Sequence, residues 1–286
     1  MSILKLYNVS KNYGKNVALN NICLKFETGR IYGLLGRNGA GKSTLINAIC
    51  NRVTSHSGSI TIDGEIVKEN NHALGRIYAM SESANMPYDM KISSIFKVTK
   101  DFYPDFDIDY AYGLAKQFDL DVNKRLGRLS TGYKTISKII TALSSGAEYI
   151  FFYEPVLGLD ANHRELFYKV MVERFIETQC CMVVSTHLID EAANLFERVI
   201  IIDDGKITVD SESEDLLKNG YSVTGAAKLV DMYCESKEVI TTRSVAGIKS
   251  AYIKGKAENV PNGLEVTKPD MQQIFISLTS PSDERM

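Results

Sequence analysis

One short segment, residues 36–43, constrains the fold of this chain more than any other. It reads Gly-Arg-Asn-Gly-Ala-Gly-Lys-Ser, which satisfies the P-loop pattern G-x-x-x-x-G-K-[ST]. An apolar run of strand length, Ile31–Leu35, leads into it, and a helical pattern at 42–51 follows. Such a turn lets backbone N–H groups converge on phosphate oxygens, and the helix N-terminus adds its dipole. The segment therefore predicts an α/β fold that binds a nucleoside triphosphate.

The residue types in the P-loop predict which groups hold the phosphates. Lys42 is expected to reach the β- and γ-phosphates, and the hydroxyl of Ser43 is expected to bind Mg²⁺. A P-loop alone leaves kinases, GTPases and many ATPases open. The residues expected to contact the nucleotide are Gly36, Arg37, Asn38, Gly39, Ala40, Gly41, Lys42, Ser43 and Thr44.

Length and composition are those of an ordinary globular chain. The 286 residues suffice for one large domain, or for one domain and a small one. A net charge of −2 provides no general basic field, so we expect no nucleic-acid partner. No stretch approaches the roughly 18–20 consecutive apolar residues of a membrane span, so spanning is expected of another chain. The five cysteines lack metal-ligand spacing and predict buried free thiols in a reducing compartment.

Hydrophobic periodicity predicts a parallel sheet covered by helices. From Leu129 onward, helical patterns alternate with short apolar runs. Near-continuous apolar strands between helices are typical of a parallel sheet buried on both faces. Residues 91–120 repeat apolar side chains at helical spacing, which predicts a helical insertion. The expected strands are 76–80, 149–153, 180–186 and 198–203. One helix is expected after Leu129, ending near 144, and two more are expected at 162–178 and 188–196.

The two ends of the chain predict smaller units. Strand-like segments at 3–7 and 22–26 precede the P-loop strand. After about Asn219 the pattern weakens, with strands expected near 239–242 and 251–253 and a last helix near 269–278. This C-terminal region carries no motif with assignable chemistry, so extra packing or dimer contacts are its expected role.

Further motifs follow the P-loop in a fixed order. Residues 129–133, Leu-Ser-Thr-Gly-Tyr, resemble an LSGGQ signature before a helix. Residues 154–160 contain Glu-Pro and then Gly-Leu-Asp, similar to the end of a Walker B strand and a D-loop. Residues 185–187, Ser-Thr-His, resemble a switch histidine, and Tyr13 resembles an adenine-stacking aromatic. Across residues 3–206 the sequence resembles the ABC ATPase family, most of all the ATP-binding subunits of bacterial drug, peptide and lantibiotic exporters.

The resemblance implies a fold and a division of the chain. The fold is a P-loop NTPase core with a mainly parallel sheet, an N-terminal antiparallel β subdomain, a helical insertion and a small α+β C-terminal extension. The implied ATPase domain spans 1–219, with its helical subdomain at about 83–145, and the accessory region spans 220–286.

The resemblance also implies how ATP is held between two domains. Tyr13 would stack on adenine, while Ser130, Gly132 and Asp160 would act across a head-to-tail dimer of identical or related domains. Two sandwiched ATP molecules would drive integral membrane permease subunits from the cytoplasmic face of the membrane. Taken alone, Tyr13 also fits a strand-end aromatic, and Ser130 also fits the N-cap of the next helix.

The resemblance also implies which side chains take part in ATP hydrolysis. Glu154 would be the general base, and His187 would contact the γ-phosphate. Glu82 occupies the Q-loop position, where the family usually has glutamine, and would sense the metal held by Ser43. Taken alone, His187 also fits an ordinary surface or core histidine.

One residue departs from the family pattern beside the expected base. A Walker B strand should end in Asp-Glu, but here Tyr153 precedes Glu154. The aspartate normally orients Mg²⁺, whereas a phenol with an ordinary pKa of about 10 is neutral at physiological pH. The signature is altered too, with Thr131 for glycine and Tyr133 for glutamine. Slow hydrolysis of Mg·ATP and a degenerate subunit that pairs with a competent partner both remain open.

The sequence is therefore compatible with three functions. An exporter ATPase docked on separate membrane subunits fits best. A non-transport ABC ATPase acting on ribosomes or DNA usually has two joined domains or long coiled coils, and the sequence predicts neither. A regulatory ATP-binding subunit stays open because of Tyr153. The transported substrate is not expected to be readable here, because substrate contacts lie mainly in membrane subunits.

Overall fold

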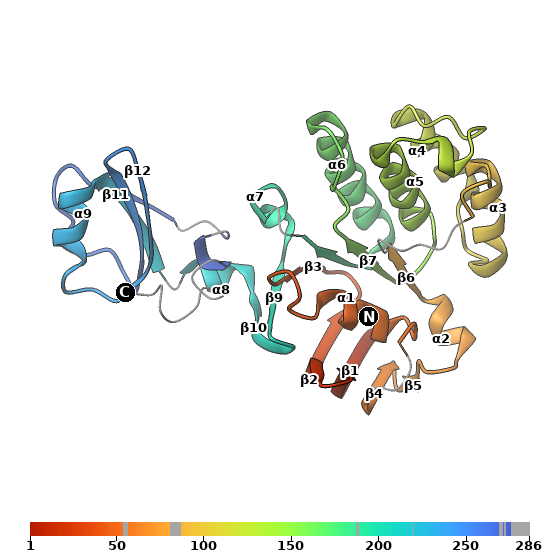
Figure 1. Cartoon of the computed structure of the whole chain (residues 1–286), viewed down its shortest axis with the longest axis horizontal. Coiled ribbons are helices and arrows are strands. Elements are labelled where there is room, and N and C mark those ends of the chain that lie inside the picture. The colour runs from red at the N-terminus through yellow and green to blue at the C-terminus, as the bar shows by residue number, and fades with distance from the viewer. Residues whose placement is uncertain are drawn as a thin grey trace.

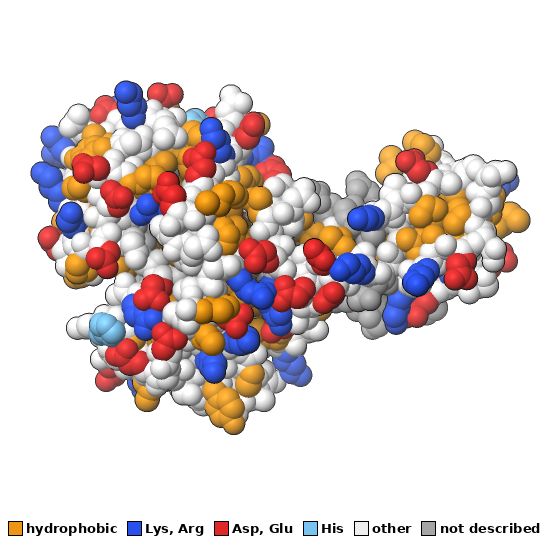
Figure 2. All heavy atoms as spheres, turned by 180° about the vertical axis from the view of Figure 1, so that it is seen from behind, with side chains coloured by type: hydrophobic (Ala, Val, Ile, Leu, Met, Phe, Trp, Pro, Cys, Tyr) orange, Lys and Arg blue, Asp and Glu red, His pale blue; other side chains and the backbone are white. Residues whose placement is uncertain are grey.

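The computed structural model describes residues 1–53, 57–80, 87–186, 189–218, 220–268, 271 and 273–275. These parts form a large lobe, built from two sheets with helices, and a small lobe around a third sheet (Figure 1). On the face drawn in Figure 2, basic and acidic side chains are interspersed over the large lobe. That face therefore carries no extended field of one sign, in keeping with the net charge of −2.

A six-stranded sheet forms the centre of the large lobe. Its order is β10 (Lys206–Glu212), β9 (Arg198–Asp203), β3 (Ile31–Leu35), β8 (Cys181–Ser185), β7 (Tyr149–Tyr153) and β6 (Ile77–Met80). The strands from β9 to β6 run parallel, and β10 pairs antiparallel with β9. Every residue of β3 and β8 is buried, as expected for strands covered on both faces. The predicted fold class is confirmed.

An antiparallel sheet covers one face of this central sheet. Its order is β2 (Asn16–Glu27), β1 (Ile3–Tyr13), β4 (Ser57–Ile62) and β5 (Glu65–Ile66), and α2 (Asn71–Gly75) follows it. Its buried side chains share one hydrophobic cluster with α1 (Lys42–Ile49) and with Phe151 of β7. β1 and β2 extend well beyond the predicted strands, because a tight turn at Gly14, with φ of 58°, joins them into a hairpin.

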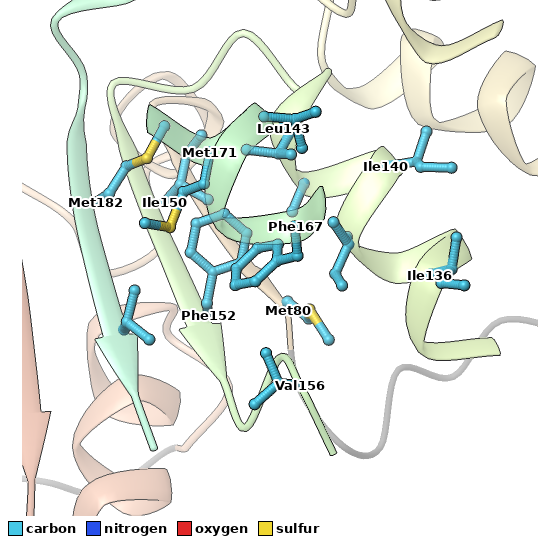
Figure 3. Packing of buried hydrophobic residues seen from close by; sticks show 14 of the residues in the cluster. Met80, Ile136, Ile140, Leu143, Ile150, Phe152, Val156, Phe167, Met171 and Met182 are labelled. Carbon is cyan, nitrogen blue, oxygen red and sulfur yellow. The ribbon is translucent and has the colours of Figure 1, made fainter. Parts of the chain in front are cut away.

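Helices cover the opposite face of the central sheet (Figure 1). They are α3 (Ile92–Phe102), α4 (Ile108–Gln117), α5 (Thr131–Leu143) and α6 (Ala161–Thr178). Figure 3 shows Phe152 of β7 facing Phe167 of α6, with ring centroids 5.5 Å apart and edge to face. Burying a side chain of this size contributes about 1.5–3 kcal/mol. The predicted helical insertion is confirmed as α3 and α4.

The small lobe is an antiparallel sheet packed against one helix. The sheet order is β12 (Val239–Val245), β13 (Ile248–Lys254), β11 (Gly220–Ala226) and β14 (Glu265–Thr267), and the helix is α9 (Ala227–Cys234). Val223, Val230 and Ile253 belong to a core of its own. The connection from the large lobe runs through α8 (Ser213–Lys218). The α+β character agrees with the prediction, but β11 and α9 were not predicted.

Two expectations differ from the structure. The helix predicted at 188–196 is broken into α7 (Ile189–Ala192) and a 3₁₀ turn (Ala193–Leu195). The tighter turn places the Phe196 ring over Gly33. A Cβ atom on Gly33 would lie only 2.5 Å from that ring. Cys180 and Cys181 are buried, but Cys23 is exposed, so the prediction of uniformly buried thiols is wrong.

Two further expectations concern the chain's end and the membrane. The helix predicted at 269–278 is described only at Met271 and residues 273–275, which are helical. Within the part of the chain that the structure describes, no helix has the length and apolar character needed to cross a bilayer.

Asp63 ties the antiparallel sheet to the central sheet and yields a pH prediction. Its carboxylate accepts hydrogen bonds from Arg76, Ser2 and the Ile3 N–H, each at 2.7 Å. Arg76 above all, with Ser2 and Ile3, lowers the pKa of Asp63 from 3.8 to about 2. Because the folded pKa is depressed, this stabilisation is present above about pH 4 and is lost as pH falls toward 2.

We therefore expect Asp63→Asn to lower the free energy of unfolding by about 1 kcal/mol at pH 7, since the site is half-exposed. The difference from the parent should shrink at pH 3. Urea titrations at both pH values check this, with Asp101→Asn, an exposed position on α3, as the matched control. An equal loss at both pH values would contradict the assignment.

Candidate nucleotide-binding site

The P-loop lies between β3 and α1 and depends on close backbone packing. A Cβ on Gly36 would lie 2.5 Å from the Ile202 carbonyl oxygen, and one on Gly41 would lie 2.6 Å from that of Ala18. Gly41 also has a φ of 114°, a conformation that side chains disfavour. Gly41 is the N-cap of α1 and has no side chain to cap the helix. The first N–H groups of α1 therefore receive no side-chain hydrogen bond from the N-cap and can donate to a bound anion.

Lys42 is buried at the start of α1. Its Nζ donates to the carbonyl oxygens of Gly36 and, at 3.1 Å, of Arg37. Burial lowers the pKa of Lys42, and the nearby carboxylate of Glu154 partly opposes this effect. The loop thus holds an ammonium group directly over its own backbone, where an entering anion would favour its charged form.

A groove opens beside the P-loop and joins it to two other elements. Gly36, Arg37 and Asn38 line it together with Tyr153 and Glu154 at the end of β7. Its volume of about 950 Å³ is large enough for a nucleotide. The other lining residues are Met80, Tyr88, Thr131, Lys134, Thr135, Lys138, Leu157 and Phe275. The structure therefore brings the expected base and the first half of the P-loop into one site.

Glu154 adopts an unusual backbone conformation directly after the carboxyl end of β7. Its φ is +45°, and its N–H donates to the Ser185 carbonyl at 2.7 Å. A non-glycine residue in the left-handed region costs roughly 1–3 kcal/mol and is typical of functional sites. Tyr153 precedes it in register with Ser185 of β8. Glu154 and Tyr153 are both half-buried.

The donor groups near the cradle decide how well Mg²⁺ fits. Among the described residues there is no group of three or more His, Cys, Asp or Glu side chains that could hold a metal ion. Ser43 is exposed at the first turn of α1, and Tyr153 stands where a carboxylate was expected. Proteins usually bind Mg²⁺ through one or two carboxylates plus substrate phosphates. Ser43 would hold a nucleotide-borne Mg²⁺ together with phosphate oxygens and water, and Tyr153 would contribute no carboxylate.

The signature and the D-loop form one packed unit beside the groove. The Ser130 hydroxyl caps α5 by accepting from the Tyr133 N–H at 3.3 Å, as predicted for an N-cap. A Cβ on Gly132 would lie 2.8 Å from the Gly158 carbonyl oxygen. Asp160 caps α6 by accepting from the His163 N–H at 2.9 Å. Ser130 and Asp160 are both exposed.

Other predicted site residues lie outside the groove or outside the described residues. Tyr13 is 49% exposed, with the Lys11 Nζ 4.9 Å from its ring centroid, and it is not among the groove-lining residues. Glu82 and His187 fall on residues that the structure does not describe. The roles proposed for these three residues stay predictions.

Two lysines of α5 were missed by the sequence analysis. Lys134 and Lys138 are one helical turn apart and line the groove that contains the P-loop. The Lys134 Nζ also lies 5.4 Å from the ring centroid of Tyr88. The sequence shows their spacing of four residues, but it does not show which side of α5 faces the groove. Together they add positive charge to a groove suited to a polyanion.

The fold and the cradle define a P-loop domain that binds nucleoside triphosphates. Comparison with known proteins narrows this class. The family described as ABC transporter matches residues 19–157. This match places an ABC transporter ATP-binding domain within residues 19–157, which contain the P-loop, Ser130 and Glu154.

Similar proteins agree with this assignment. ABC transporter ATP-binding protein YtrB of Bacillus subtilis is 28% identical over 221 residues, covering 76% of this chain and 75% of the relative. Lantibiotic transport ATP-binding protein SrtF of Streptococcus pyogenes is 28% identical over 212 residues, covering 73% and 91%. Nod factor export ATP-binding protein I of Burkholderia lata is 25% identical over 219 residues, covering 74% and 71%.

Solved structures share the fold. The ATP-binding subunit of an ABC transporter superposes with a TM-score of 0.67 at 22% identity, covering 75% of this chain and 91% of its own. An ATP-binding cassette in a dimeric post-hydrolysis state, bound to ADP and Pi, has a TM-score of 0.66 at 23% identity, with coverages of 73% and 98%.

The close contact between Gly132 of the signature and Gly158 of the D-loop predicts how a substitution at Gly132 changes stability, with Gly113 of α4 for comparison. Gly132→Ala should lower the melting temperature, because its Cβ would lie 2.8 Å from the Gly158 carbonyl and force the two loops apart. Gly113→Ala, in the exposed middle of α4, meets nothing within 4 Å and should stabilise by about 0.5–1 kcal/mol. Thermal unfolding of both variants tests this pair, and equal shifts would show that the contact is not tight.

Proposed function

We propose that this chain is the ATP-binding subunit of an exporter, and that two such domains close head to tail on ATP and move separate membrane subunits. The observation that carries the proposal is the groove in which the P-loop meets Glu154. Relatives named for lantibiotic transport and Nod factor export support the exporter assignment. The proposed location is the cytoplasmic face of the membrane, peripheral and held by permease subunits.

In this proposal, the chain's own groups bind and orient the triphosphate. Backbone N–H groups at the start of α1 and the Lys42 ammonium hold the β- and γ-phosphates. Lys134 and Lys138 add charge from the other wall of the groove. The Glu154 carboxylate accepts a proton from the attacking water and orients it. When bound, Mg²⁺ would neutralise charge that develops on the phosphates.

The second domain completes the site in this proposal. Ser130 and Asp160 are exposed at the N-termini of α5 and α6, where a partner can reach them. A helix N-terminus with an accessible hydroxyl suits the γ-phosphate bound by the opposite copy. ATP then acts as the ligand that shifts the pair from open to closed.

A second candidate, a regulatory subunit with little turnover, is favoured by one observation. Tyr153 places a neutral phenol beside Glu154, where phosphoryl-transfer catalysis calls for a carboxylate that orients the metal. ATP binding does not need that carboxylate, whereas efficient hydrolysis does.

Replacing Tyr153 with aspartate separates the two candidates. We expect Tyr153→Asp to raise ATP hydrolysis about tenfold or more and to tighten Mg²⁺ binding, because a carboxylate restores a charged metal partner. Steady-state hydrolysis and Mg²⁺ titrations measure both quantities. Should neither change, while Glu154→Gln abolishes turnover, the metal site is adequate as it stands.

Replacing Lys42 tests nucleotide capture itself. Lys42→Ala should weaken binding of a fluorescent ATP analogue by about thirtyfold or more, because a buried charge-assisted contact to phosphate is lost. Lys116→Ala, exposed on α4, is the matched control and should bind normally. Similar losses in both variants would point away from the P-loop.

Co-purification distinguishes transport from other ABC functions. An exporter subunit should be recovered with a hydrophobic membrane chain. Recovery with ribosomes or DNA instead would favour the non-transport alternative.

A further inference from the structure

The last described residues of the chain return from the small lobe to the nucleotide groove. We call Met271 and residues 273–275 the cap segment. Met271 is 4% exposed and belongs to the main hydrophobic cluster of the large lobe, which also contains Ile189 and Phe196. Phe275 packs against the same cluster and lines the groove together with Arg37 and Asn38. The cap segment therefore lies against the large lobe, although β14 of the small lobe precedes it in the chain.

The cap segment is also tied to the small lobe. The Ser222 hydroxyl of β11 donates to Gln273 Oε1 at 2.6 Å, and Ser222 is itself buried. Ile274, between Gln273 and Phe275, is only 2% exposed. The cap segment thus bridges the two lobes. Met271 is buried in the core of the large lobe, and Gln273 bonds to the buried Ser222 of the small lobe.

The position of Phe275 has a consequence for pairing. Arg37, Asn38 and Gly39 are exposed in the P-loop. In the proposed head-to-tail pair, the signature helix of the second copy approaches the phosphates across the groove that Arg37 and Asn38 line. Phe275 lines the same groove. Burial of apolar side chains holds the segment there, so displacing it costs free energy.

We propose that the cap segment is an intramolecular restraint on ATP-driven pairing, and that a second copy of the domain must displace it from the groove that contains the P-loop. This inference rests on the proposed function, since it assumes that pairing occurs across the groove. Through Gln273, the small lobe sets how firmly the cap segment is held. The accessory region thereby gains a regulatory role in place of simple packing.

Hydrogen exchange of the full chain, followed by mass spectrometry with and without ATP, tests this directly. ATP should increase protection of the P-loop amides and decrease protection of the cap-segment amides. Protection of the P-loop without any loss in the cap segment overturns the inference and leaves the proposed function standing. No added protection in the P-loop overturns both.

A variant series provides the second test. Phe275→Ala, made in a Glu154→Gln background to slow turnover, should lower the protein concentration needed for ATP-dependent self-association about fivefold or more. Phe102→Ala, an exposed phenylalanine at the end of α3, is the matched control and should match the background. Sedimentation measures both. Unchanged or weaker self-association of Phe275→Ala overturns the proposal.

Discussion

The nucleotide site depends on how tightly the P-loop backbone is pressed against its neighbours. Gly36 and Gly41 approach the carbonyl oxygens of Ile202 and Ala18 so closely that no side chain fits at either position. Because the loop lies against the sheet, Lys42 is buried and its ammonium turns onto the loop's own carbonyls. In such a site, water screens the attraction between an ammonium and a phosphate only weakly. Glycine at these two positions is therefore a requirement of packing as well as of phosphate contact.

The parallel sheet explains why distant residues share one groove. β3 and β7 both neighbour β8 and run in the same direction, so their carboxyl ends meet at one edge. The P-loop follows β3, and Glu154 follows β7. Ligands of open α/β sheets bind at this edge. The strained φ of Glu154 marks the turn that holds its carboxylate there.

Much of this arrangement was predictable, because its signals are local. The P-loop, the apolar strands β7 and β9 and the N-cap at Ser130 each depend on a few consecutive residues, and the structure has them where they were expected. The direction of Lys134 and Lys138 was not predictable, since it depends on how α5 packs against the sheet. Phe275 was missed for the same reason: only the tertiary structure brings it to the P-loop. β11 and α9 lack the strong periodicity that revealed the central sheet.

The central claim is that the P-loop of a single chain binds the triphosphate, while the chain's hold on the metal is weak. Calorimetric titration of the unmodified chain with ATP, once with Mg²⁺ and once with a chelator, tests it most directly. The account predicts saturable binding in both cases, with affinities within about tenfold, or ~1.4 kcal/mol. ATP binding that disappears without Mg²⁺ would contradict it.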